Sequence, residues 1–180
     1  MKRLSLFAAL AATLLTSAAS AQSVGEKTGV NSVLGVSPST ADFVKEAATS
    51  DMLEIAAAKV AQSKGNAEEK KFAEQMIADH GKTSSDLKSM VGSGEVKAEI
   101  PAALDDSSQK KLDKLNAAKP EDFAGEYDPM QVSAHKDAVS LFERYAKGGD
   151  NAKLKDWAGK TLPALQHHLE MAEAMNKNRK

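Results

Sequence analysis

Apolar residues recur three, four or seven positions apart in four long segments of the chain, which is the spacing of one face of an α-helix. In the second of these segments, Phe72, Met76, Leu87 and Val91 fall on a single stripe. Strands have little support, because the chain is rich in alanine, lysine, glutamate and leucine and only 4% aromatic. The pattern predicts four long helices, near residues 39–63, 66–91, 120–147 and 151–176.

The ends of these segments carry helix-capping signals. Ser39 precedes the first stripe as an N-cap residue, and Asn66 with Glu69 resembles a capping box at the start of the second. Pro120 stands where a first-turn proline is favoured, and the glycine pair 148–149 ends the third segment. These signals place the helix boundaries independently of the apolar pattern.

The connections predict how the helices are arranged. The short turns after the first and third helices imply two antiparallel pairs, whereas residues 92–119 can cross the end of a bundle. A short helix fits residues 107–118 of this crossover. Pro129 and Pro163 lie inside helical patterns, where we expect bends. The sequence therefore predicts an all-α four-helix bundle with a crossover segment that carries a short helix.

Each long helix has one ionisable residue at the centre of its apolar stripe. At ~100° per residue, Asp128 also shares the stripe of the third helix, one heptad before its central residue. His167 points roughly 100° away from its neighbour on the fourth helix and falls at the edge of the stripe. The four central residues are Glu54, His80, His135 and His168.

These four side chains are candidates for a mononuclear metal site. Imidazole and carboxylate are ligands for zinc, iron, manganese or copper, and facing helices of a bundle can build such a site in the core. One divalent transition metal would be the cofactor. Two alternatives stay open: a carboxylate and a histidine acting as acid and base, or histidines that are simply hydrogen-bonded to neighbouring carboxylates or carbonyls.

Axial position weighs against convergence of all four. At ~1.5 Å per residue, Glu54 and His80 differ in level by roughly one turn. His135 and His168 are further apart, at about 12 and about 18 residues from the turn between their helices. A dinuclear carboxylate site is disfavoured more firmly, because such sites use Glu-x-x-His and no histidine of this chain has a glutamate three positions earlier.

A second group of possible ligands lies near the end of the fourth helix. Thioether and imidazole together suit copper(I), and three of the residues follow a four-residue spacing. Methionine is also a common filler of apolar cores, which is the alternative explanation. The group consists of His167, His168, Met171 and Met175.

The first residues have the three-part plan of a secretory signal peptide. Lys2 and Arg3 precede an apolar run at 4–15, and small residues at 19–21 form a cleavage site. The run is shorter than the ~20 residues of a membrane span, and we expect no transmembrane segment after cleavage and a periplasmic or secreted protein. The predicted plan is a signal peptide at 1–21, a flexible lead at 22–38, the bundle at 39–176 and a basic tail at 177–180.

Charge and cysteine content limit which classes of partner, cross-link and metal site the chain can have. The formal net charge is −1, and losing Lys2 and Arg3 with the leader would lower it to −3. Such a mild balance predicts neither nucleic acid nor a membrane surface as a partner. The chain has no cysteine, which excludes disulfides and thiolate metal sites.

Short motifs spread over residues 39–175 carry a resemblance to a known family. They are Phe43-Val44, Met52, Glu54, Lys71-Phe72-Ala73, Met76, Asp79-His80, Lys82, Ile100-Pro101, Asp122-Phe123, Tyr127, Met130, Ala134-His135, Leu162-Pro163 and His168. With these residues the segment resembles the bacterial domain-of-unknown-function family 4142, and the matching positions include all four inward residues. This resemblance implies an exported, ferritin-like bundle and no established activity, and the absent Glu-x-x-His pattern departs from ferritin-like metal sites.

Two classes of function follow from these observations. The first is an exported, non-enzymatic bundle with an envelope or stress-associated role that binds an unidentified protein or small ligand. The second is a metalloprotein for storage, sensing or redox work, with Glu54, His80, His135 and His168 as ligands. The sequence identifies no catalytic residue.

Overall fold

The computed structural model describes residue 32 and residues 34–179 of the 180-residue chain. The predicted signal peptide and the first part of the predicted lead lie outside the described residues. Within residues 34–179 the chain forms five helices and no strand, so the predicted all-α class is confirmed. They are α3 (Thr40–Lys64), α4 (Ala67–Gly92), α5 (Asp106–Ala117), α6 (Pro120–Gly148) and α7 (Ala152–Asn178).

Local capping explains why the helices begin where the sequence predicts. The Ser39 hydroxyl accepts a hydrogen bond from the backbone N–H of Asp42 at the start of α3. At the start of α4, the Asn66 side chain accepts from the backbone N–H of Glu69, and Glu69 Oε2 accepts from the backbone N–H of Asn66 at 2.7 Å. This reciprocal pair is a complete capping box.

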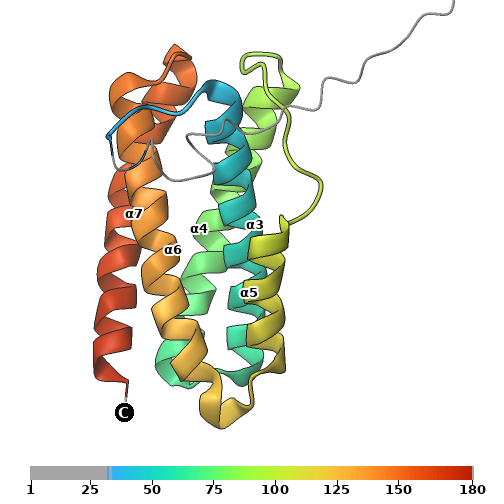
Figure 1. Ribbon diagram of the computed structural model, residues 1–180, viewed down its shortest axis with the longest axis vertical. Helices are drawn as coiled ribbons and strands as arrows, with labels where there is room; N and C mark the ends of the chain where they lie inside the picture. Colours follow the sequence, from blue (N-terminus) through green and yellow to red (C-terminus); the bar gives the residue numbers. More distant parts are fainter. Residues whose placement is uncertain (1–31, 33, 180) are drawn as a thin grey trace, which may run out of the picture.

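The four long helices form a bundle of two antiparallel pairs. The α3 helix packs mainly on α4, and α6 packs mainly on α7 (Figure 1). The crossover descends along the outside of the bundle to α5, which lies against α3 (Figure 1). Helices α6 and α7 continue through Pro129 and Pro163, so neither proline ends its helix. Among the described helices, none is both long and apolar enough to cross a membrane.

The apolar core is divided into two clusters along the bundle axis. The upper cluster includes Phe43, Leu87, Phe142, Tyr145 and Leu154, and the lower cluster includes Ala57, Phe72, Met76, Tyr127 and Met175. Each long helix contributes to both clusters, and each helix places buried polar residues between its two contributions. The bundle therefore has a polar layer between two apolar regions.

Candidate metal centre

Three histidines meet in this polar layer. His80 belongs to α4, His135 to α6 and His168 to α7, and the residues are 2%, 1% and 2% exposed, respectively. Their ring centroids are 5.8 Å apart for the first and second, 5.6 Å for the first and third, and 5.5 Å for the second and third. One nitrogen from each ring lies within 4.8 Å of the other two.

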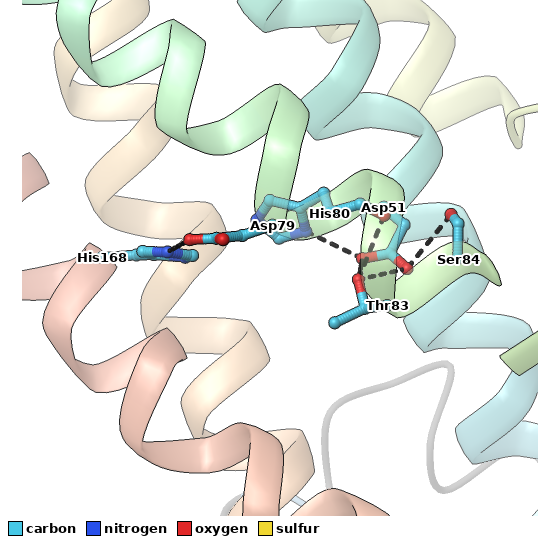
Figure 2. Close-up of polar contacts among 6 residues, drawn as sticks. All are labelled: Asp51, Asp79, His80, Thr83, Ser84 and His168. Atoms are coloured by element: carbon cyan, nitrogen blue, oxygen red, sulfur yellow. Dashed lines mark hydrogen bonds and ion pairs between the residues drawn. The ribbon is translucent and has the colours of Figure 1, made fainter. Parts of the chain in front are cut away.

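The carboxylate of Asp51 on α3 orients the His80 ring. Asp51 Oδ1 lies 2.8 Å from His80 Nδ1. The Thr83 hydroxyl donates to the same carboxylate at 2.9 Å and the Ser84 hydroxyl at 3.2 Å, as Figure 2 shows. An ionised carboxylate can only accept, so His80 Nδ1 carries a proton and Nε2 of the neutral ring presents a lone pair.

One hydrogen bond holds each of the other two rings. His168 Nε2 lies 2.8 Å from Asp79 Oδ2 (Figure 2), and the side chain of Gln75 donates to the same oxygen at 2.6 Å. His135 Nδ1 donates to the backbone carbonyl of Gln131 at 2.9 Å. Each ring is therefore fixed through one nitrogen, which leaves the other nitrogen to point elsewhere.

The second nitrogen of each ring is unpartnered, meaning that no residue which the structure describes hydrogen-bonds to it. These atoms are His80 Nε2, His135 Nε2 and His168 Nδ1, and all three are buried. An unpaired buried polar atom costs ~1–3 kcal/mol, so three at one place call for a shared partner. A metal bound at ~2.0–2.1 Å to each nitrogen would hold them ~3.3 Å apart, which is closer than the 4.8 Å within which one nitrogen of each ring lies.

The three rings differ in their electrostatics. Burial lowers the pKa of His168 to about 4, and burial also lowers the pKa of His135. Burial opposes a charge on His80 as well, but the hydrogen bond and charge of Asp51, together with the charges of Glu54 and Asp79, raise the pKa of His80. Of the three rings, His80 is therefore the one at which a proton competes most with a metal ion.

Glu54 lies near the three histidines but outside their group. It is 1% exposed, and in the described part of the chain neither of its carboxylate oxygens has a hydrogen-bond partner. It lies about one turn beyond Asp51 on α3, and its charge acts on His80 and His135. Three of the four predicted ligands are therefore brought together, and Glu54 is not among them.

The predicted axial gap between His135 and His168 is wrong, since their ring centroids are 5.5 Å apart. The residue count treated α6 and α7 as straight rods that start from a common level. Each helix contains a proline, which removes a backbone hydrogen bond and permits the axis to change direction. Helical periodicity alone therefore cannot fix relative height over such long helices.

Sequence reasoning missed the residues that orient the histidines. Each histidine does bond to a neighbouring carboxylate or carbonyl, as one alternative held, but through only one of its two nitrogens. Asp51 could have been found, because it precedes Glu54 by three positions and so shares its face of α3. Asp79 gave no such signal, since adjacent residues on a helix point about 100° apart.

The predicted copper(I) group is not assembled as a single site. The His167 side chain is 67% exposed and its Nδ1 lies 3.8 Å from Glu170. Met175 is 3% exposed and packs in the lower cluster, where it acts as apolar filler. His168 already belongs to the three-histidine group.

Comparison with known proteins adds a family but no activity. The family model described as Domain of unknown function (DUF4142) matches residues 25–175. No curated protein and no solved structure matches the chain. The chemistry of the site must therefore be argued from its own residues.

Proposed function

Because the chain belongs to the DUF4142 family, whose description gives no function, we propose from the site geometry that it binds one divalent transition-metal ion. The ligands are His80 Nε2, His135 Nε2 and His168 Nδ1. Two observations carry the proposal: one nitrogen of each ring lies within 4.8 Å of the other two, and each ring has one buried, unpartnered nitrogen while an acceptor holds the other. Acceptors of this kind fix the ring orientation and raise the basicity of metal-binding histidines.

The donor set limits which metals fit. Imidazole nitrogens suit zinc, copper, nickel and iron, whereas magnesium and calcium prefer oxygen ligands. Three protein ligands leave one coordination position for water. Glu54 is the nearby carboxylate to which such a water could donate a hydrogen bond. The histidines are at most 2% exposed, so only small molecules could reach the ion without a rearrangement. We therefore propose metal binding rather than turnover of a large substrate.

The proposed location is the periplasm or the exterior of the cell, where an envelope role would follow. Its support is the charged, apolar and small-residue plan of residues 1–21. Mass spectrometry of the protein from fractionated bacterial cells would find a mature chain that begins at Gln22. A full-length chain confined to the cytoplasmic fraction would contradict this location.

Metal titration of the mature, untagged protein tests the proposed function. After removal of metal with a chelator, cobalt(II) is titrated at neutral pH and followed by its visible absorption, and bound metal is quantified by elemental analysis. We expect one ion per chain, and more than about 100-fold weaker binding for His135→Ala, which removes a direct ligand. His167→Ala is the matched control, since it removes an exposed histidine from the same bundle.

Two results would contradict the proposal. One is the absence of binding by the wild-type chain for cobalt, zinc, copper and nickel alike. The other is binding by His135→Ala with the affinity and stoichiometry of the wild type, which would place the ion at a different site.

A further inference from the structure

A second set of buried polar side chains lies between the three histidines and the lower end of the bundle. We call it the polar column; its members are Glu54, Glu69, Tyr127, Asp128 and Gln131, and each is at most 2% exposed. Over the part of the chain that the structure describes, seven of their side-chain atoms have no hydrogen-bond partner: both Glu54 oxygens, Glu69 Oε1, Tyr127 Oη, Asp128 Oδ1 and both Gln131 amide atoms.

Helix α6 connects the polar column to the metal centre. Tyr127, Gln131 and His135 are spaced four residues apart, so they lie on one face of α6 and rise ~6 Å per step. The Gln131 backbone carbonyl accepts from His135. The Phe72 ring of α4 packs edge-on against both Tyr127 and His135, with centroid distances of 6.4 and 6.0 Å. The column therefore begins directly below the histidines.

The lower end of the column reaches the molecular surface. Glu69 Oε2 accepts from the backbone N–H of Asn66 at the first turn of α4. Asp128 lines a surface pocket together with Asn66, Glu68 and Arg179. Buried carboxylates therefore extend from the metal centre to a pocket that is open to solvent.

The side chains that face Asp128 make it suited to exchange protons. Burial and the charge of Glu69 raise the pKa of Asp128 to about 6, with a smaller contribution from Glu68 in the same direction and an opposing one from Arg179. Burial and the charges of Glu54, Glu69 and Asp128 raise the pKa of Tyr127 far above its ordinary value. Tyr127 therefore stays a hydroxyl donor, while Asp128 can gain or lose a proton near neutral pH.

Water can supply both the donors and the acceptors that these groups need. Ionised carboxylates only accept hydrogen bonds, whereas a hydroxyl or an amide also donates, and internal waters join groups of both kinds. The apolar side chains around the column include the small residues Ala57, Ala58, Ala61 and Ala73, all of which are fully buried.

We propose that the polar column is a hydrated proton pathway that connects the metal centre with the pocket at the lower end of the bundle. The proposal rests on the proposed metal binding, since a bound ion acidifies the water that completes its coordination. That proton passes to the Glu54 carboxylate, then through waters bonded to Gln131 and Tyr127, and then to Asp128 and bulk water. Each transfer breaks one O–H bond and forms another, so no other reactant is needed.

Rapid mixing of the metal-free mature chain with cobalt(II) tests the pathway. A pH indicator in weakly buffered solution reports proton release, and the visible absorption of cobalt reports binding. We expect Tyr127→Phe and Asp128→Asn each to slow proton release about tenfold, with one cobalt still bound per chain. The first removes the hydroxyl that holds a pathway water, and the second removes a group that accepts and releases the proton. Tyr145→Phe is the control, since it removes the same hydroxyl from the upper cluster.

The outcomes separate the pathway from the function on which it rests. Proton release at the wild-type rate in both column variants, with cobalt still bound, would overturn the pathway alone. Failure of the wild type to bind cobalt would overturn the proposed function and the pathway with it. As a second measurement, a high-resolution crystal structure should show ordered waters bonded to Glu54 and Tyr127 Oη; a dry column would overturn the pathway.

Discussion

Two fully buried tyrosines, one in each apolar cluster, have opposite surroundings. In the upper cluster, Tyr145 Oη lies 2.5 Å from the Thr40 hydroxyl and 3.3 Å from Asp150, which joins the start of α3 to the turn before α7. In the lower cluster, Tyr127 stacks on Phe123 at a centroid distance of 5.1 Å, and its hydroxyl has no partner among the described residues.

The difference separates polar groups that are hydrogen-bonded within the fold from polar groups for which we propose a metal ion or water as the partner. A satisfied buried network stabilises one arrangement of the chain, whereas unpaired buried groups reduce stability and persist where function uses them. The upper network around Tyr145 belongs to the first kind. The three histidines and the polar column belong to the second.

The largest difference between the three histidines and the upper network is expected in the stability that a bound metal adds. A ligand present at 1,000 times its dissociation constant stabilises the folded state by ~4 kcal/mol. Zinc should increase the free energy of unfolding of the wild type, measured with denaturant, by this amount. It should increase that of His80→Leu, which loses a ligand nitrogen, by less than ~1.4 kcal/mol. Tyr145→Phe should keep the full increase. An equal increase in His80→Leu would remove the distinction between the two regions.

Replacing an acceptor that orients a histidine should have a smaller effect, which is a loss of metal affinity. Asp51→Asn keeps the shape of the side chain but removes the charge that supports His80, and such changes weaken metal binding ~10–100-fold. The same substitution in the upper network, Asp150→Asn, should leave metal affinity unchanged. Titration calorimetry measures both, and unchanged affinity in Asp51→Asn would show that this carboxylate has no part in the site.

The pH dependence of stability should have opposite signs in the two regions. Because its pKa is raised to about 6, Asp128 contributes stability that is fully present below its ordinary value of 3.8 and is lost as the pH rises through 6. The hydrogen bond from Thr40 lowers the pKa of Asp150, so its contribution is present above 3.8 and is lost as the pH falls.

Urea unfolding of the metal-free protein between pH 4 and 8 checks these signs. We expect Asp128→Asn to gain ~1–2 kcal/mol over the wild type at pH 7, less than the full pKa shift implies because the pocket beside Asp128 is solvated. The gain should vanish near pH 4. At neutral pH, Asp150→Asn should lose stability. A gain that does not depend on pH would contradict the titration of Asp128.

The smallest contrast concerns the two tyrosine hydroxyls in the metal-free protein. Tyr145→Phe removes one hydrogen-bond partner each from Thr40, from Asp150 and from the backbone N–H of Asn151, while Thr40 and Asp150 stay bonded to each other. It should cost ~1–2 kcal/mol. Tyr127→Phe removes a hydroxyl that has no partner in the described structure and should change stability by less than ~0.5 kcal/mol. Denaturant unfolding at one pH compares the two variants directly, and equal losses would show that Tyr127 is structurally hydrogen-bonded.

Local signals in the sequence were enough to predict the helices. The capping box of Asn66 and Glu69 placed the start of α4 at residue 66, and the structure has the helix at Ala67–Gly92 with Asn66 as its cap. The apolar stripes also turned His80, His135 and His168 inward, and all three are buried. Caps and stripes depend on residues a few positions apart, which a single sequence displays.

The assembly of the site depends on contacts that no single helix displays. The relative height of His135 and His168 is set by the packing and direction of two helices, and a residue count predicted a gap that does not exist. Asp79 approaches His168 across 89 positions of sequence. The packing of the whole bundle fixes the distances between residues on different helices. The sequence therefore indicated candidate ligands but not which of them lie close together.

A crystal structure of the mature chain with zinc or cobalt, located by its anomalous scattering, tests the three-histidine site directly. We predict one ion between α4, α6 and α7, bonded at ~2.0–2.1 Å to His80 Nε2, His135 Nε2 and His168 Nδ1. Asp51 and Asp79 should keep their bonds to the opposite nitrogens. An ion bound only at surface residues such as His167, with the three buried rings still unbridged, would contradict the account.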